Sequence, residues 1–398
     1  MHPEFRKNWT LDDDFVFLNH GSFGAVPKAV QEHQAGLRAL LASQPVRFLA
    51  REWPSALAES RLALASFVGC PAEDLVLIPN ATFGVNSVIH AYPFRQGDRV
   101  LVTDHEYNAC RNALDAAAER AGVEVDVVAL PFPPGSREEI ADAVLGAVRP
   151  ETRLALLDHI TSPTGLLMPV EDLISGMKER GVHVLVDGAH GPGHVPLDLE
   201  ALGADFYTGN CHKWMGTPLG TALLYCRREH QEWLRPPVVS HGRNTTLENG
   251  RTRFQEEFGW TGTFDPTPWM CIPVAISVMG GMVPGGWSEV MARNRSLAVE
   301  ARDLLGEGLG QETKVPNDLL SSMVSFRLPD GDADALHGRL VDAGLEVPVM
   351  AWPPTPPGGH HGRILRVSCQ LYNDLSDYER LLDVLPGLVL ESAQESGR

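Results

Sequence analysis

The chain has 398 residues, with 33 Lys and Arg against 51 Asp and Glu, a formal net charge of −18 at pH 7. Such an acidic chain is repelled by nucleic-acid phosphates and anionic lipids, so we expect neither nucleic acid nor a membrane as a partner. Hydrophobic residues make up 43% and charged residues 21%, a globular balance that excludes collagen-like, coiled-coil and disordered chains.

Between about residues 55 and 225, short β-branched runs alternate with amphipathic stretches, which predicts a mostly parallel sheet covered by helices. Seven strands are predicted, over residues 75–78, 99–103, 123–129, 153–159, 183–186, 206–208 and 221–225. Helices fit between them over 108–121, 136–148 and 170–180. The last helix ends before Gly181, a residue type that closes helices at low cost.

After Pro266 the pattern changes to that of an α+β domain. Predicted there are helices over 267–280, 287–309, 333–343 and 374–385, with strands over 322–328 and 364–368. We therefore divide the chain into a large domain, residues 1–270, and a smaller C-terminal domain, residues 271–398.

No apolar run approaches the roughly 20 residues that span a bilayer, and the N-terminus lacks the apolar core of a secretory signal. The six cysteines are scattered and form no CxxC pair, so free thiols are expected. Together these features predict a cytoplasmic protein.

Asp187 directly follows the apolar strand predicted over 183–186. Ligands of open α/β sheets bind at the carboxyl ends of strands, so Asp187 indicates the expected site, although an Asp that only caps the next segment would look the same. Lys213 follows the next strand, between His212 and Trp214. The other lysines occupy ordinary polar positions, whereas a lysine in these surroundings is a candidate for a desolvated amine that forms Schiff bases.

Asp187 and Lys213 make chemical sense together if the cofactor is pyridoxal 5'-phosphate (PLP). The lysine would bind its aldehyde, and the carboxylate would keep its pyridine nitrogen protonated, so that the ring acts as an electron sink. Residues 80–84 follow a strand and open a helix, so their N–H groups and the Thr82 hydroxyl offer a phosphate site. Asn and Thr also cap many helices that bind nothing.

At this point the chain resembles the class V aminotransferase family of fold-type I PLP enzymes, in its isopenicillin N epimerase-like branch. The resemblance runs from residues 18–24 to 366–368. It implies an α/β fold with a mostly parallel seven-stranded sheet, a smaller C-terminal α+β domain, and a homodimer in which Thr263 reaches the neighbouring active site. The cofactor-binding residues that it implies are Ala81, Thr82, Tyr107, Asp187, His190, Asn210, His212, Lys213 and Thr263.

The resemblance also implies how an amino acid substrate is held. Tyr107 is expected to stack on the cofactor ring, while His105 is equally well explained as a solvated loop histidine. Arg366 is expected to bind the substrate carboxylate, because its planar fork offers two parallel hydrogen bonds; Arg363 is interpreted as flanking it. Asn19 lies where related enzymes line the substrate entrance.

Labilising the Cα–H bond of a bound amino acid gives a carbanion that can be reprotonated, transaminated or discharged by β-elimination. Epimerisation through that carbanion is our first prediction, with Lys213, Asp187 and Tyr107 as catalytic residues. The acid on the second face stays open among Tyr107, His241, His360, His361 and Tyr372. We predict no metal, since the two adjacent histidines have no third ligand in view.

The alternative is a β-eliminating C–S lyase acting on a cysteine conjugate or sulfoxide. Persulfide-forming desulfuration is disfavoured, because the sequence has no cysteine between Cys271 and Arg366. A non-catalytic binding protein is less favoured still, since it would not need the Schiff-base lysine.

Overall fold

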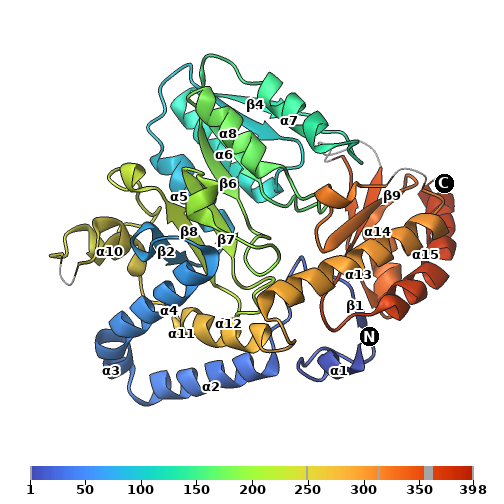
Figure 1. The fold of residues 1–398 in the computed structure, drawn as a ribbon, viewed down its shortest axis with the longest axis horizontal. Helices are drawn as coiled ribbons and strands as arrows, with labels where there is room; N and C mark the ends of the chain where they lie inside the picture. The colour runs from blue at the N-terminus through green and yellow to red at the C-terminus, as the bar shows by residue number, and fades with distance from the viewer. Residues whose placement is uncertain (1, 248–249, 312–313, 354–361, 397–398) are drawn as a thin grey trace.

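The computed structural model describes the chain except for residues 1, 248–249, 312–313, 354–361 and 397–398. Its centre is a seven-stranded sheet in the order β2-β8-β7-β6-β5-β3-β4 (Figure 1). The strands are β2 (Leu75–Ile78), β3 (Arg99–Thr103), β4 (Glu124–Val128), β5 (Thr152–Asp158), β6 (His183–Asp187), β7 (Phe206–Asn210) and β8 (Ala222–Cys226). Strand β8 runs antiparallel to the other strands of this sheet. The predicted α/β fold with a mostly parallel seven-stranded sheet is confirmed.

Strand β6 shows how the sequence builds two hydrophobic layers. Val184 and Val186 contribute to one buried cluster and Leu185 to the other. Successive side chains of a strand point to opposite faces, so a strand covered on both faces needs a continuous apolar run. Helices α5 (Ala81–Ala91) and α6 (Asn108–Ala121) cover one face, and α4 (Trp53–Val68), α7 (Arg137–Gly146) and α8 (Val170–Glu179) cover the other.

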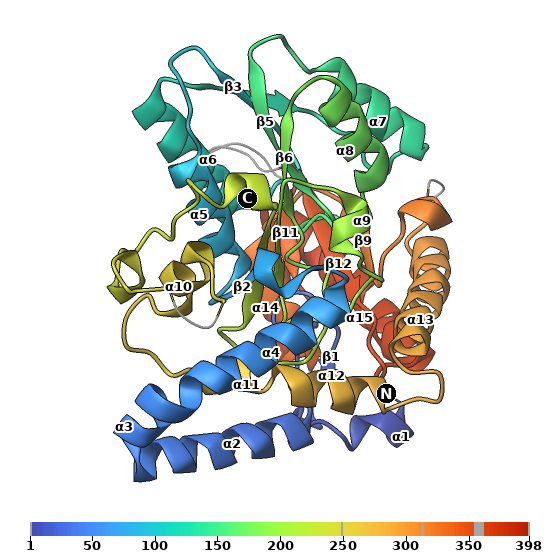
Figure 2. The same cartoon turned by 60° about the vertical axis from the view of Figure 1, so that its left-hand side comes forward.

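Helix α2 (Lys28–Ser43) lies along the side of the molecule with α4, α11 (Thr267–Met270) and α12 (Ile272–Gly280) (Figures 1 and 2). The single helix predicted over 267–280 is divided at Cys271. Pro273 follows within the first turn of α12, and a proline has no N–H to continue a helix from the preceding turn. Shorter helices are α1 (Pro3–Arg6), α3 (Pro45–Arg47), α9 (Leu199–Leu202) and α10 (Arg253–Gly259).

The C-terminal part combines an antiparallel sheet with helices, as the α+β prediction requires. Strands β11 (Val349–Ala351), β12 (Arg363–Ser368) and β9 (Met323–Leu328) form the sheet in that order. Its helices are α13 (Trp287–Gly308), α14 (Ala333–Asp342) and α15 (Leu375–Ser396). Strand β1 (Val16–Phe17) pairs with β10 (Leu345–Glu346), so the N-terminal segment is attached to this part. The boundary between residues 270 and 271 stays a prediction.

No helix in the described ranges is long and apolar enough to cross a membrane.

Candidate active site

A cavity of about 500 Å³ lies where β5, β6 and β7 end. Asp158, Asp187 and Asn210, the last residues of these strands, line it. This is the edge at which open α/β sheets bind ligands. The structure brings most of the predicted site residues together in the wall of this cavity, namely Ala81, Thr82, Tyr107, Asp187, His190, Asn210, His212, Lys213 and Arg366.

The contact between His190 and Lys213 fixes the position of one hydrogen atom. Nε2 of His190 lies 3.2 Å from Nζ of Lys213, and Nδ1 accepts a hydrogen bond from Nε1 of Trp214 at 3.4 Å. An indole N–H can only donate, so a neutral His190 carries its hydrogen on Nε2. That N–H then donates to Nζ, which accepts it as an uncharged amine.

The electrostatics of the two residues agree with this assignment. Burial, and then the positive charge of Arg366, lowers the pKa of Lys213 to about 7, against an opposing effect of Asp187. Burial and the neighbouring Lys213 hold the pKa of His190 well below its ordinary value, so the imidazole is neutral. An uncharged amine is the form that attacks a carbonyl carbon, which is the property expected of a Schiff-base lysine.

Asp187 is 2% exposed and has hydrogen-bond donors on both carboxylate oxygens. Oδ1 accepts the N–H of Ala189 at 2.9 Å, and Oδ2 accepts the thiol of Cys110 at 3.1 Å. Burial raises the pKa of Asp187, opposed by these two donors and by Lys213. Sequence reasoning missed Cys110, because it lies 77 residues from Asp187 and nothing in its local sequence shows that it faces the site.

The start of α5 offers one free backbone donor. Asn80 caps the helix, with Oδ1 accepting the N–H of Phe83 at 2.8 Å. Asn210 accepts the N–H of Ala81, also at 2.8 Å, so that donor is already used. Within the described chain no group accepts the N–H of Thr82. The helix N-terminus and this donor suit an anion such as a phosphate.

His212 also lines the cavity. Its Nδ1 bonds to the carbonyl oxygen of Thr221 at 2.9 Å, which orients the ring. Burial and the adjacent Lys213 lower the pKa of His212 to about 4, so the ring is neutral at pH 7. Because Nδ1 donates to that carbonyl, Nε2 of the neutral ring carries no hydrogen and can accept a hydrogen bond at the cavity without adding charge.

Arg366 is a buried cation held by two hydrogen bonds. Nη1 donates to the carbonyl oxygen of Ser162, and Nη2 donates to Oγ of Ser22 at 2.9 Å. Its Nε is buried without a partner among the described residues, an arrangement that an anionic ligand would relieve. Arg363 donates instead to the carbonyl oxygen of Pro329 at 2.8 Å, which agrees with its interpretation as a flanking residue.

Two predicted residues lie outside the cavity. Asn19 donates from Nδ2 to Oε1 of Glu346 at 3.0 Å and is not among the described residues that line the cavity. Thr263 is exposed and likewise does not belong to the described lining within its own chain. Both assigned roles stay predictions, and that of Thr263 requires a second subunit.

The interpretation of His105 as a solvated loop histidine is wrong. The residue is 0% exposed, with Nδ1 at 2.8 Å from Oγ1 of Thr164. Its ring packs edge-on against Trp352, with centroids 4.5 Å apart. Trp352 is remote in the sequence, so the residues around His105 carried no sign of this burial.

The residues predicted as candidates for the acid on the second face of the substrate lie in different parts of the structure. Tyr107 lines the cavity and is 47% exposed. His241 is exposed elsewhere, and Tyr372 is buried with its hydroxyl 2.8 Å from Nδ1 of His20. His360 and His361 lie outside the described residues.

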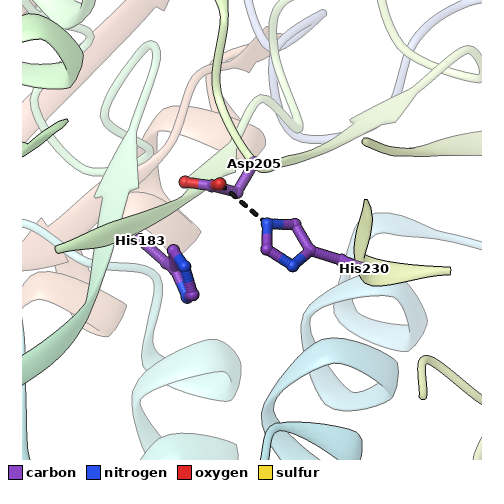
Figure 3. A group of neighbouring side chains, drawn as sticks. All are labelled: His183, Asp205 and His230. Carbon is purple, nitrogen blue, oxygen red and sulfur yellow. Dashed lines mark hydrogen bonds and ion pairs between the residues drawn. The ribbon is translucent and has the colours of Figure 1, made fainter. Parts of the chain in front are cut away.

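Away from the cavity, His183, Asp205 and His230 have the spacing of metal ligands (Figure 3). Nε2 of His230 donates to Oδ1 of Asp205 at 2.9 Å, and the N–H of Val184 donates to Oδ2 at 2.8 Å. His183 bonds through Nδ1 to the hydroxyl of Tyr92 at 2.7 Å. Hydrogen bonds therefore account for this cluster, and the prediction of no metal is unchanged.

Comparison with known proteins assigns the family. The aminotransferase class-V model matches residues 24–381. The chain is 34% identical over 401 residues to isopenicillin N epimerase of Streptomyces clavuligerus, covering 98% of each chain. It is 31% identical over 411 residues to the probable chloroplastic L-cysteine desulfhydrase of Arabidopsis thaliana, covering 95% of this chain and 84% of that one.

Among solved structures, a variant of the protein C-DES with glycine covalently linked to its PLP cofactor superimposes with a TM-score of 0.82. Its sequence identity is 22%, and the match covers 96% of this chain and 98% of that chain. The chain belongs to the class-V aminotransferase family, a group of fold-type I PLP enzymes, and its cofactor is PLP.

The side chains of the cavity fit this cofactor. An uncharged amine at Lys213 suits the aldehyde, and an anionic oxygen pair at Asp187 suits a protonated pyridine nitrogen. The free N–H of Thr82 at the start of α5 suits the phosphate.

Proposed function

We propose that this protein is an amino acid epimerase similar to isopenicillin N epimerase, which removes the Cα proton of its substrate and returns a proton on the other face. The observation that carries the proposal is that two acid–base groups line one cavity, namely the hydroxyl-bearing Tyr107 and an uncharged Lys213 that lies 3.2 Å from His190. It gives the cofactor site a base that works near neutral pH. Two relatives named isopenicillin N epimerase, 34% and 35% identical, support the reaction type.

PLP, when bound, supplies the electron sink that acidifies the Cα–H bond. Lys213 takes the proton at Nζ, since a base with a pKa of about 7 combines adequate strength with the deprotonated form. The hydroxyl of Tyr107 delivers a proton on the opposite face; among the described second-face candidates it is the one that lines the cavity. Arg366 holds the substrate carboxylate with the help of its unpaired Nε.

A β-eliminating C–S lyase is the second candidate. It needs one base at Cα, because the proton is not returned there, and Lys213 alone meets that need. Relatives named L-cysteine desulfhydrase, such as the Arabidopsis thaliana protein that is 31% identical over 404 residues, support this reading. The two functions therefore differ in whether Tyr107 is essential.

We also propose a cytoplasmic homodimer in which Thr263 reaches the partner's cofactor site. Phe23 lines the cavity yet is 70% exposed, and a second subunit would cover such an apolar side chain. The six cysteines are free, which suits a reducing compartment.

The deciding experiment incubates the holoenzyme in heavy water with a panel of L- and D-amino acids and cysteine conjugates, each separately. Deuterium at Cα with mixed chirality and no pyruvate supports the epimerase. Pyruvate, ammonia and a released sulfur fragment would instead support the lyase and remove the epimerase proposal. A Lys213→Ala variant controls for exchange that does not depend on the enzyme.

A further inference from the structure

Three carboxyl groups are buried close together, and two of them, Asp158 and Asp187, line the cavity. Glu106, Asp158 and Asp187 are 7%, 3% and 2% exposed. Asp158 and Asp187 are register partners at the ends of the adjacent parallel strands β5 and β6, so their side chains leave the sheet on the same face. A carboxylate oxygen of Glu106 lies within 4.8 Å of one on Asp187. Carboxylates this close in a buried site do not all ionise.

The hydrogen bonds distinguish Asp187 from the other two carboxyl groups. Both oxygens of Asp187 accept a donor, from Cys110 and from Ala189. Glu106 accepts the N–H of Tyr107 on Oε1 at 3.0 Å, but its Oε2 is buried without a partner among the described residues.

Oδ2 of Asp158 is likewise a buried oxygen for which the described chain supplies no donor. An anionic oxygen in that position is costly, whereas a protonated carboxyl group carries an O–H that can itself donate.

The positive charges around Glu106, Asp158 and Asp187 are too few to neutralise three carboxylates. Lys213, which faces Asp187, has a pKa lowered to about 7 and is the uncharged amine described above. Arg111 acts on Glu106 only weakly, since its Nε is bonded to Asp115 at 2.9 Å. Three further titratable neighbours are uncharged at neutral pH, namely Cys110, His159 and Tyr207. Burial and mutual repulsion raise the pKa of Glu106 and Asp158 well above the usual range.

We propose that Glu106 and Asp158 remain protonated carboxylic acids in the holoenzyme, and that the three carboxyl groups together carry a single negative charge, on Asp187. Glu106 and Asp158 are then positioning residues, because they act on the cofactor through Asp187. Asp158 also presents an O–H in the cavity wall. The inference deepens the proposed function, since it rests on Asp187 as the partner of the pyridine nitrogen.

The decisive measurement is infrared spectroscopy of the substrate-free holoenzyme at neutral pH, with carboxyl carbons labelled by ¹³C in either aspartate or glutamate. Protonated carboxyl groups absorb apart from carboxylates, so we expect one acid band that shifts with each label. Glu106→Gln should remove the glutamate-sensitive band, and Asp158→Asn the aspartate-sensitive band. If the wild-type holoenzyme shows neither band, the proposal is overturned, whether or not the variants fold.

A second readout is the pH dependence of the absorbance of the bound cofactor. Glu106→Gln replaces one uncharged group by another, so the pH midpoint of the absorbance change should stay at the wild-type value. A midpoint lowered by about one pH unit would mean that a negative charge had been removed, and would contradict the proposal. Neither measurement uses a substrate, so a failed epimerase assay leaves this test intact.

Discussion

Nε2 of His190 donates its hydrogen to Nζ of Lys213 across 3.2 Å, so the lysine accepts a hydrogen bond as an uncharged amine. This relationship makes the pH dependence of cofactor binding predictable. In the apoprotein the rate of covalent PLP attachment should rise with pH as Lys213 loses its proton, with a midpoint near 7, and level off above it. Stopped-flow absorbance after mixing apoprotein with PLP measures this attachment rate at each pH. If the pH midpoint of the attachment rate instead lies near the pKa of a solvated lysine, the assignment of Lys213 as an uncharged amine is contradicted.

Lys213→Ala should abolish covalent cofactor attachment. Borohydride reduction followed by mass spectrometry should find the PLP adduct on Lys213 in the wild-type protein and none in the variant. Lys178→Ala is the matched control, because that lysine lies exposed on α8. An adduct that persists in Lys213→Ala at the wild-type level would place the Schiff base elsewhere.

Tyr107→Phe separates the two proposed reactions. If Tyr107 delivers the second-face proton, the variant should lose about 100-fold or more in inversion rate, the usual range for a general acid. It should still exchange the Cα hydrogen of one enantiomer with heavy water, because Lys213 is unaffected. Undiminished inversion in the variant would exclude Tyr107 as the second acid.

Arg366→Lys tests the carboxylate site. A lysine keeps the charge but loses the planar fork, so we expect KM to rise about 10- to 100-fold, with a smaller change in kcat. The parallel change at Arg363, which donates to the carbonyl oxygen of Pro329, should leave KM near the wild-type value and lower thermal stability instead. Equal KM effects of the two substitutions would count against Arg366 as the carboxylate ligand.

Thr263→Ala tests the shared active site. Loss of one hydrogen bond to a charged phosphate should weaken PLP affinity about tenfold, which equilibrium dialysis would measure. Analytical ultracentrifugation should find dimers of both proteins. A monomeric wild-type protein, or unchanged affinity in the variant, would refute the contribution of Thr263 across subunits.

The position of the site could be predicted from sequence because it depends on strand ends. Asp187 and Lys213 each follow an apolar strand, and adjacent parallel strands bring their carboxyl ends together. Asp158 ends the neighbouring strand β5, so the same rule would have found it. Cys110 and His105 could not be predicted, because their environments depend on partners remote in the chain, as with His105 and Trp352.

The hydrogen bond from Nη2 of Arg366 to Oγ of Ser22 joins positions 344 residues apart. During synthesis the ribosome must therefore add a further 344 residues after Ser22 before this part of the cavity wall can form. Strand β1 likewise cannot pair until β10 has been made. A truncation at the N-terminus that removed Ser22 would act as an active-site mutation, because it would leave a second donor of the buried Arg366 without its protein partner.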